Sequence, residues 1–377
     1  MTDAAVPLPA PHPWSLSRLR LGVQIVLLGV TVYGGLVTGP YMADKLANAL
    51  PALSCAFDQQ NGGYCALIPF QHQFHHQLGE GLARTGSLAW ATLWPVLVTL
   101  MIFLAFFIFL NKAFCGWVCP LGTVQELLGK AGRRLHLRLR YLPPGWVGRV
   151  RLVKWLLLLF LVFALPLAAG LGLAPQAAGD AWCRICPSRI VTTLLTGNPE
   201  QLAMAIGSPL EVILGILGNL LAGFVLMAAF VVRQPFCRIC PMLALHALFR
   251  RLPPLRLAKQ RHPRCGRCHS CHAACPMEIR EISTADGPAA FHDDCTLCGR
   301  CIEYCPEENV LSLRLGPLTL YRSSRALFQT RTGCESPAGF PKKRPMPTIS
   351  ATPATPTIPT TPIIPTPGTA TERTGHG

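Results

Sequence analysis

Four stretches of this chain contain no charged residue and are long enough to cross a lipid bilayer. An apolar run of about 18 residues or more is typical of a membrane-spanning helix. Four such runs in one chain argue against the alternative, buried helices of a soluble core. We therefore predict a polytopic α-helical membrane protein with about four transmembrane helices. The runs cover residues 21–39, 86–110, 155–178 and 212–232.

The composition fits a membrane protein that carries a metal or redox module. Half of the 377 residues are hydrophobic and only 14% are charged, too few to cover a large soluble globule. The formal net charge of +16 would indicate nucleic-acid binding in a soluble protein. Here the basic residues cluster beside the apolar runs, so we expect contact with the lipid bilayer and no nucleic acid.

Basic residues are concentrated in two of the connecting segments. Residues 111–154 contain nine Lys or Arg, and residues 233–264 contain eight. Residues 40–85 and 179–211 contain two each. Positively charged loops stay in the cytoplasm. We therefore expect a bacterial cytoplasmic (inner) membrane protein with both termini inside and the two poorly charged segments outside.

A cysteine run with the spacing C-x2-C-x2-C-x3-C-P begins at Cys265 and recurs at Cys295. This duplication is typical of bacterial ferredoxins with two [4Fe–4S] clusters, in which the fourth cysteine ligates the other cluster. Zinc sites do not need the third cysteine and the proline, and disulfides are disfavoured in a reducing compartment. We predict Cys265, Cys268, Cys271 and Cys305 as ligands of cluster 1, and Cys295, Cys298, Cys301 and Cys275 as ligands of cluster 2.

Two further cysteine pairs, each ending in Cys-Pro, directly follow apolar runs. Cys115 and Cys119 follow the second run, and Cys237 and Cys240 follow the fourth. Both pairs are therefore expected at the inner membrane face, where their four thiolates supply a third [4Fe–4S] cluster.

A similar pair, Cys183 and Cys186, follows the third run and is expected at the outer face. With Cys55 and Cys65 of the first outer loop it supplies either a fourth cluster or two disulfides. The apolar stretch after it, near residues 190–206, is expected to re-enter the membrane or to lie at its interface. Cys334 stands alone and receives no role.

The segment "PFQHQFHHQLGEGLAR" contains four candidate groups for a quinol site, His72, His75, His76 and Glu80. His72, His76 and Glu80 share one face if this segment is helical. Histidine titrates near neutral pH and accepts protons from a quinol. Ligation of haem or copper and a plain amphipathic surface helix remain open alternatives.

These features divide the chain into four parts. Residues 1–20 are a cytoplasmic N-terminus, residues 21–255 a membrane domain, and residues 256–315 an α+β ferredoxin domain. Residues 316–377 form a tail, expected to be disordered from about residue 335 because its Pro- and Thr-rich composition cannot bury a core.

The motif "FCGWVCPLGTVQELL", the later "FCRICP", the spans and the trailing ferredoxin run resemble the NapH/MauN-type membrane polyferredoxins, which are related to NosR-type and CcoG-type proteins. Cys115, Cys119, Cys237 and Cys240 match the membrane-adjacent motif of that family. The resemblance implies electron transfer between the quinone pool and an iron–sulfur, cytochrome or reductase partner subunit. This chain departs from the family in its Cys-x2-Cys-Pro pairs, where Cys-x3-Cys-Pro is common, and in its Pro-Thr tail.

Two functions follow from this pattern. The first is a quinol-oxidising oxidoreductase component, or a carrier, that moves electrons through several clusters. The second is an iron–sulfur redox sensor or a metal-reducing assembly factor for another enzyme. The chain contains no P-loop and no dinucleotide-binding fingerprint, so the sequence does not support direct use of NAD.

Overall fold

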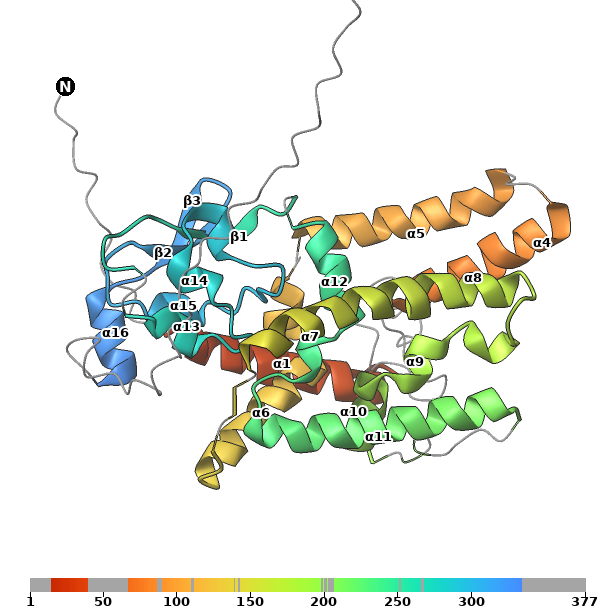
Figure 1. Ribbon diagram of the computed structural model, residues 1–377, viewed down its shortest axis with the longest axis horizontal. Helices are drawn as coiled ribbons and strands as arrows, with labels where there is room; N and C mark the ends of the chain where they lie inside the picture. Colours follow the sequence, from red (N-terminus) through yellow and green to blue (C-terminus); the bar gives the residue numbers. More distant parts are fainter. Residues whose placement is uncertain are drawn as a thin grey trace, which may run out of the picture. The chain divides into compact units, whose positions relative to one another are not determined.

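The computed structural model consists mainly of helices, with one small sheet in the C-terminal part of the described chain (Figure 1). The structure describes residues 15–39, 67–86, 90–109 and 112–333, apart from residues 139, 142, 198, 200–201, 203–206, 251 and 266–267. All of these belong to one compact unit, residues 1–341.

Helices make up the described chain as far as residue 248. Two sets of them, α3 to α4 and α7 to α8, follow one another without a break and each form one longer helix. The helices are α1 (Leu16–Thr38), α3 (Leu67–His72), the π-helix η2 (Gln73–Glu80), α4 (Gly81–Thr85), α5 (Trp90–Phe109), the π-helix η3 (Phe114–Val118), α6 (Pro120–Arg134), α7 (Pro144–Leu157), the π-helix η4 (Leu158–Ala164), α8 (Leu165–Gly170), η5 (Gln176–Ala178), α9 (Ala181–Ile185), α10 (Pro187–Leu195), α11 (Pro209–Val231), η7 (Phe236–Arg238) and α12 (Pro241–Leu248).

Among the residues that the structure describes, three helices are long and apolar enough to cross a membrane. They are Leu16–Tyr33 in α1, Gly145–Gly170 from α7 to α8, and α11. The apolar stretch of α5, Leu93–Ala105, is shorter. Leu220 and Phe224 of α11 are each 67% exposed, as expected for a surface that faces lipid. The structure therefore supports three spans, and a fourth along α5 stays a prediction.

The helix expected at residues 155–178 begins earlier, at Pro144. Its first turns include Arg151 and Lys154. The expected run leaves these two residues out because it is defined by the absence of charge. Both side chains form ion pairs with Asp294, and Lys154 is completely buried. A distant carboxylate thus allows a basic segment to continue an apolar helix, which no local sequence pattern shows.

α9 and α10 turn back among the long helices. α10 packs against α6 and α11 and also approaches α1, and Figure 1 shows it beside α11. Its buried residues include Ile190, Val191 and Thr192. α10 therefore packs among the helices, and its placement relative to the membrane stays a prediction.

The C-terminal part of the described chain combines an antiparallel three-stranded sheet with short helices. β1 (Leu255–Lys259) pairs with β2 (Leu311–Leu315), which pairs with β3 (Leu318–Arg322). The helices are α13 (Ser270–Ala274), α14 (Glu281–Thr284), η8 (Gly287–Ala290), α15 (Arg300–Glu303) and α16 (Arg325–Thr332). α13 and α15 each contain the third cysteine of one cysteine run, so the sequence repeat is also a structural repeat.

β3 and α16 extend this ferredoxin part beyond the boundary expected at residue 315. Leu315 pairs with Leu318 across the β2–β3 hairpin, so that boundary falls inside the sheet. Phe328 of α16 is completely buried, and Arg331 forms an ion pair with Glu303 of α15 at 3.1 Å. The Pro- and Thr-rich tail lies outside the described residues.

Candidate metal centres

The eight cysteines of the duplicated run line two separate cavities. These contain about 380 and 310 Å³ of space not filled by protein atoms. Cys265, Cys268, Cys271 and Cys305 line the first, and Cys275, Cys295, Cys298 and Cys301 line the second. The fourth cysteine of each run therefore lies at the cavity of the other run, the crossed arrangement that the spacing predicts. Four thiols around each cavity fit the donor set of a [4Fe–4S] cluster, and ligation itself stays a prediction.

The loops that carry these cysteines contain residues in left-handed backbone conformations. His269 and Gly299 follow the second cysteine of each run, with φ of 51° and 71°. Leu297, between Cys295 and Cys298, has φ of 51°. Such turns direct successive backbone N–H groups to one side and create a binding site for an anion. Both loops are therefore shaped for a group that carries negative charge, as a thiolate-bound cluster does.

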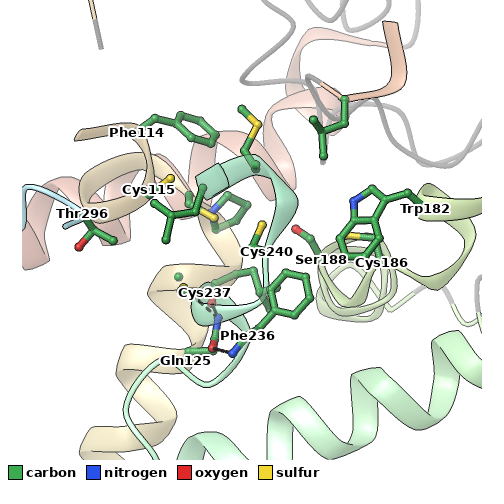
Figure 2. A pocket seen from close by; sticks show the side chains of 17 residues that line it. Phe114, Cys115, Gln125, Trp182, Cys186, Ser188, Phe236, Cys237, Cys240 and Thr296 are labelled. Carbon is green, nitrogen blue, oxygen red and sulfur yellow. Dashed lines mark hydrogen bonds between the residues drawn. The ribbon is translucent and has the colours of Figure 1, made fainter. Parts of the chain in front are cut away.

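A third and larger cavity, the membrane-face cavity, lies where η3, α6, η7, α10 and α12 meet (Figure 2). It contains about 740 Å³ of space not filled by protein atoms. Other lining side chains are largely apolar, among them Phe114, Trp182 and Phe236. Its five cysteines are Cys115, Cys119, Cys186, Cys237 and Cys240. The two pairs that we expected to serve one site therefore line one cavity.

Three of these cysteines stand at helix N-termini. Cys119, Cys186 and Cys240 are the N-cap residues of α6, α10 and α12, and proline takes the first helical position each time. Proline suits this position because it lacks an N–H group, and it holds the preceding residue in an extended conformation. The positive ends of three helix dipoles are thus directed at one cavity, where they favour thiolates.

The position of Cys186 corrects the sequence-based expectation. We expected Cys183 and Cys186 to lie apart from the inner pairs, together with Cys55 and Cys65. Cys186 instead lines the membrane-face cavity, because α9 and α10 turn back among the long helices. Cys183 lies beside it and accepts a hydrogen bond from Nε2 of Gln71 at 2.9 Å. Cys55 and Cys65 lie outside the described residues.

The thiols of the membrane-face cavity are strongly desolvated. Burial raises the pKa of Cys237 to about 12, with a further contribution from Cys119. Gln125 of α6 lies beside Cys237, and its Oε1 accepts a hydrogen bond from the backbone N–H of Phe236 at 3.1 Å. Metal ligation requires thiolates, so a metal that binds here must release protons. A bound metal would supply the positive charge that offsets the cost of forming thiolates in this buried site.

The membrane-face cavity and the second ferredoxin cavity share a wall. Thr296 lines both of them. Its carbonyl oxygen would lie 2.2 Å from a Cβ on Gly116, so only glycine fits there. Nε1 of Trp117 donates a hydrogen bond to the carbonyl oxygen of Leu297 at 3.0 Å. The backbone between Cys115 and Cys119 thus packs directly on the loop between Cys295 and Cys298.

A buried carboxylate joins the membrane helices to the ferredoxin part. Glu126 of α6 forms ion pairs with Arg20 of α1 at 2.8 Å, with Lys130 at 3.5 Å and with Arg300 of α15. Burial alone would raise the pKa of Glu126, but Arg300, Arg20 and Lys130 lower it to about 2. The ionised carboxylate therefore holds three elements together.

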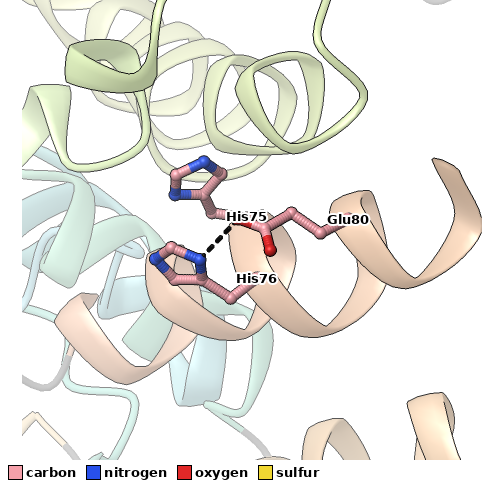
Figure 3. Close-up of side chains that lie close together, drawn as sticks. All are labelled: His75, His76 and Glu80. Carbon is pink, nitrogen blue, oxygen red and sulfur yellow. Dashed lines mark hydrogen bonds and ion pairs between the residues drawn. The ribbon is translucent and has the colours of Figure 1, made fainter. Parts of the chain in front are cut away.

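The four candidate quinol residues lie together on α3 and η2, and three of them are drawn in Figure 3. The rings of His72 and His76 are 4.5 Å apart, and Nδ1 of His76 pairs with Oε1 of Glu80 at 2.8 Å. His75 is buried against Gly179, and a ligand atom of His75, one of His76 and one of Glu80 all lie within 4.8 Å of one another. His72, His76 and Glu80 therefore share one face, as predicted for a helix.

Sequence reasoning missed the residues that connect the two parts: Gly116, Thr296, Glu126 and Asp294. One signal was available, because Glu126 is the only acid among the nine basic residues of 111–154. Gly116, Thr296 and Asp294 contact residues more than a hundred positions away in the chain. Contacts over such a distance leave no local pattern in the sequence.

Two iron–sulfur family models match the chain. A family described as a 4Fe-4S binding domain matches residues 92–138 and again residues 214–260. A family described as a 4Fe-4S dicluster domain matches residues 264–311. The first two matches cover α5 to α6 and α11 to α12, so the apolar helix, the Cys-Pro pair and the following helix form an internal repeat.

Several proteins of known name are similar over much of the chain. YccM of Escherichia coli (strain K12), provisionally named an electron transport protein, is 27% identical over 80% of this chain and 78% of its own length. The ferredoxin-type protein NapH of the same strain is 25% identical over 79% of this chain and 88% of its own length. The regulatory protein NosR of Stutzerimonas stutzeri is 28% identical over 55% of this chain and 25% of its own. No solved structure matches the chain.

Proposed function

Because the chain belongs to the NapH-type membrane polyferredoxins, which are related to NosR, we propose that it relays electrons between the quinone pool and a redox partner through [4Fe–4S] clusters. Iron–sulfur electron transport is the property that this family shares. The electrons would enter or leave at a quinone site and at a partner protein, with the clusters between them. The main support is that the membrane-face cavity and the second ferredoxin cavity share a wall at Thr296.

The proposed path has three clusters. Cluster 1 is held by Cys265, Cys268, Cys271 and Cys305, and cluster 2 by Cys275, Cys295, Cys298 and Cys301. Cluster 3 lies in the membrane-face cavity and is held by Cys115, Cys119, Cys237 and Cys240. When bound, the clusters supply one-electron chemistry, and the chain holds and spaces them. A fourth cluster is not part of the proposal, because Cys186 lines the membrane-face cavity.

The step between clusters 3 and 2 depends on the close packing of their loops. Gly116 touches the backbone of Thr296, and Trp117 is hydrogen-bonded to Leu297. Electron transfer slows steeply as the gap between two centres widens. A contact with no room for a Cβ therefore keeps this step short.

The proposed quinone end is formed by His72, His75, His76 and Glu80. Oxidation of a quinol releases two protons along with two electrons, and a neutral imidazole can accept a proton. Burial and the neighbouring histidines lower the pKa of His72 and of His75, so both rings are neutral near pH 7. Gln71, directly before His72, donates a hydrogen bond to Cys183. The histidine group thus lies one hydrogen bond from the α9–α10 segment that leads to the membrane-face cavity.

The proposed setting is the cytoplasmic (inner) membrane, with the ferredoxin part inside. Positive residues in segments 111–154 and 233–264 support this orientation. Cysteine-bound clusters also persist better in a reducing compartment. The redox partner is then a protein that reaches cluster 1 from the inner side.

The experiment is anaerobic addition of a short-chain quinol to the purified full-length protein, with cluster reduction followed by EPR. Reduction of the clusters is the expected result. The Cys119→Ala variant should lose reduction of clusters 1 and 2 by quinol while dithionite still reduces them. Cys268→Ala is the matched control, because it removes cluster 1 only and leaves cluster 3 reducible by quinol.

Two results would count against the relay. If no cluster responds to quinol but the protein forms cuprous ion from cupric ion in a cluster-dependent way, the metal-reducing function is correct instead. If the anaerobic protein contains no iron, the clusters themselves are wrong.

A further inference from the structure

The hydroxyl group of Thr296 is buried and lies between two cysteine-lined cavities. Thr296 is 2% exposed. Within the described part of the chain, its Oγ1 has no hydrogen-bond partner. A buried hydroxyl without a partner costs free energy, on the order of 1–3 kcal/mol. Such a group in a packed core indicates a partner that the protein atoms do not supply.

The surroundings of Thr296 indicate what that partner is. The residue belongs to the loop between Cys295 and Cys298 and lines both the second ferredoxin cavity and the membrane-face cavity. Figure 2 shows its hydroxyl oxygen on the side turned away from Cys115. A hydroxyl is a hydrogen-bond donor, and sulfur is the acceptor atom that a bound cluster and its cysteines offer there.

We propose that Thr296 Oγ–H donates a hydrogen bond to a sulfur of cluster 2 and thereby raises the reduction potential of that cluster. This inference rests on the proposed ligation of cluster 2. Reduction adds negative charge to the sulfurs, and a donor stabilises the more negative state, so the potential rises. Hydrogen bonds to sulfur are one of the factors that set the potentials of such clusters.

The duplicated run provides an internal comparison. The position of Thr296 in the second run is taken by Gly266 in the first, so the first run has no hydroxyl there. The first run has a buried hydroxyl at another position, Ser270, whose Oγ also lacks a hydrogen-bond partner among the described residues, so the two runs place their donors differently. The donor at Thr296 belongs to the loop that packs on the membrane-face cavity, so removing it should affect cluster 2 and leave cluster 1 unchanged.

The test is a redox titration followed by EPR on the anaerobically purified full-length protein. Thr296→Val keeps the branched shape and removes the hydroxyl. We expect one midpoint potential to become more negative, by roughly a tenfold change in the reduction equilibrium, about 59 mV for one electron, with iron content unchanged. Thr296→Ser keeps the hydroxyl and should stay near wild type. Thr319→Val, at an exposed position in β3, is the matched control and should shift nothing.

A second measurement starts from the wild-type protein. ENDOR spectra of the reduced wild-type protein in D2O should show an exchangeable proton coupled to cluster 2, and Thr296→Val should lack it. If Thr296→Val fails to assemble cluster 2, the ENDOR spectra still decide. Absence of the exchangeable proton coupling in the wild type would overturn the inference. Presence of that coupling in the wild type and its loss in Thr296→Ala would support the inference.

Three further outcomes would overturn the inference. These are unchanged midpoints in Thr296→Val, an equal shift in Thr296→Ser, or a shift confined to the signal that Cys119→Ala removes. Failure of the proposed function gives different results. A wild-type protein without iron would show that there are no clusters. If quinol does not reduce the clusters but a midpoint potential shifts in Thr296→Val, the relay is wrong and this inference is still supported.

Discussion

Arg300 of α15 forms an ion pair with Glu126 of α6, and this pair joins the ferredoxin part to the membrane helices. The same carboxylate accepts two hydrogen bonds from Nη2 of Arg20 in α1, at 2.8 and 2.9 Å. Arg20 is completely buried. One carboxylate therefore balances two guanidinium groups that reach it from different elements.

Replacing Glu126 with Gln should weaken this junction. The change leaves Arg20 and Arg300 without their counter-charge, and breaking a buried ion pair typically costs about 3–5 kcal/mol. We expect the Glu126→Gln protein to unfold at a clearly lower temperature in detergent. Glu308→Gln is the control. Glu308 is exposed, and the amide oxygen of the variant side chain can still accept the hydrogen bond from the backbone N–H of Arg325.

The effect of Glu126→Gln should depend on pH. The folded-state pKa of Glu126 is lowered from 4.5 to about 2, so its ionisation adds about 3 kcal/mol of stability above pH 4.5. That contribution is lost as the pH falls from 4.5 through about 2. The difference in unfolding temperature between wild type and Glu126→Gln should therefore shrink below pH 4.5. A constant difference between pH 7 and pH 3 would contradict this account.

Replacing Gly116 with Ala should separate the two cysteine-bearing loops. The added Cβ would lie 2.2 Å from the carbonyl oxygen of Thr296, which is backbone and cannot rotate away. We expect a weaker magnetic interaction between clusters 2 and 3 in EPR, and a slower reduction of cluster 2 by quinol. Gly148→Ala is the matched control, because a Cβ there meets nothing within 4 Å, and it should behave as wild type.

Lys154 and Asp294 should be strongly coupled in a double-mutant cycle. Lys154 is completely buried and pairs with Asp294, which Arg151 also contacts at 2.7 Å. Asp294→Asn leaves the buried ammonium group without its counter-charge and should cost about 3–5 kcal/mol in urea unfolding. The double variant Lys154→Met/Asp294→Asn should cost less than the sum of the single changes. Additive costs would show that the pair contributes nothing as a pair.

Cys119→Ala and Cys240→Ala should each remove the same cluster. The two residues come from different Cys-Pro pairs but line one cavity, so either change leaves three of the four thiolates. We expect both variants to lose the same EPR signal and about four irons per chain, as a [4Fe–4S] cluster requires. Cys334→Ala is the control and should keep all its iron. Loss of two different signals would rule out a shared site.

Cys186→Ala tests the fifth cysteine of the membrane-face cavity. Four thiolates complete the coordination of a cubane, so Cys186 is expected to be a neighbour of cluster 3 and not its ligand. The variant should keep its iron content while the EPR line shape of cluster 3 changes. A loss of four irons would instead assign Cys186 to a cluster.

Spacing made the ferredoxin cavities predictable. Three cysteines of each run lie within a short loop and the fourth is directed to the other run, so the intervals between residues 265 and 305 predict which cysteines share a cavity. The shared cavity of Cys115 and Cys240 was also predictable, because each pair directly follows an apolar helix. Both inferences rest on local patterns that geometry or the membrane imposes.

The rest depended on contacts between distant residues. Arg300 and Glu126 are 174 positions apart, and neither residue is unusual within its own segment. The inward turn of α9 and α10, which brings Cys186 to the membrane-face cavity, depends on how α10 packs on α6 and α11. A short apolar stretch looks the same in sequence whether it lies at an interface or turns inward.

The membrane-face cavity also implies an order of events during synthesis. Cys115 and Cys240 are 125 residues apart, which a ribosome takes roughly 6 to 25 seconds to translate. During that interval the first two thiols exist without the second two, and the loop carrying Thr296 is made later still. All four thiols of the cavity are therefore present only after Cys240 has been made, and the ferredoxin loop that walls the cavity at Thr296 is added after them.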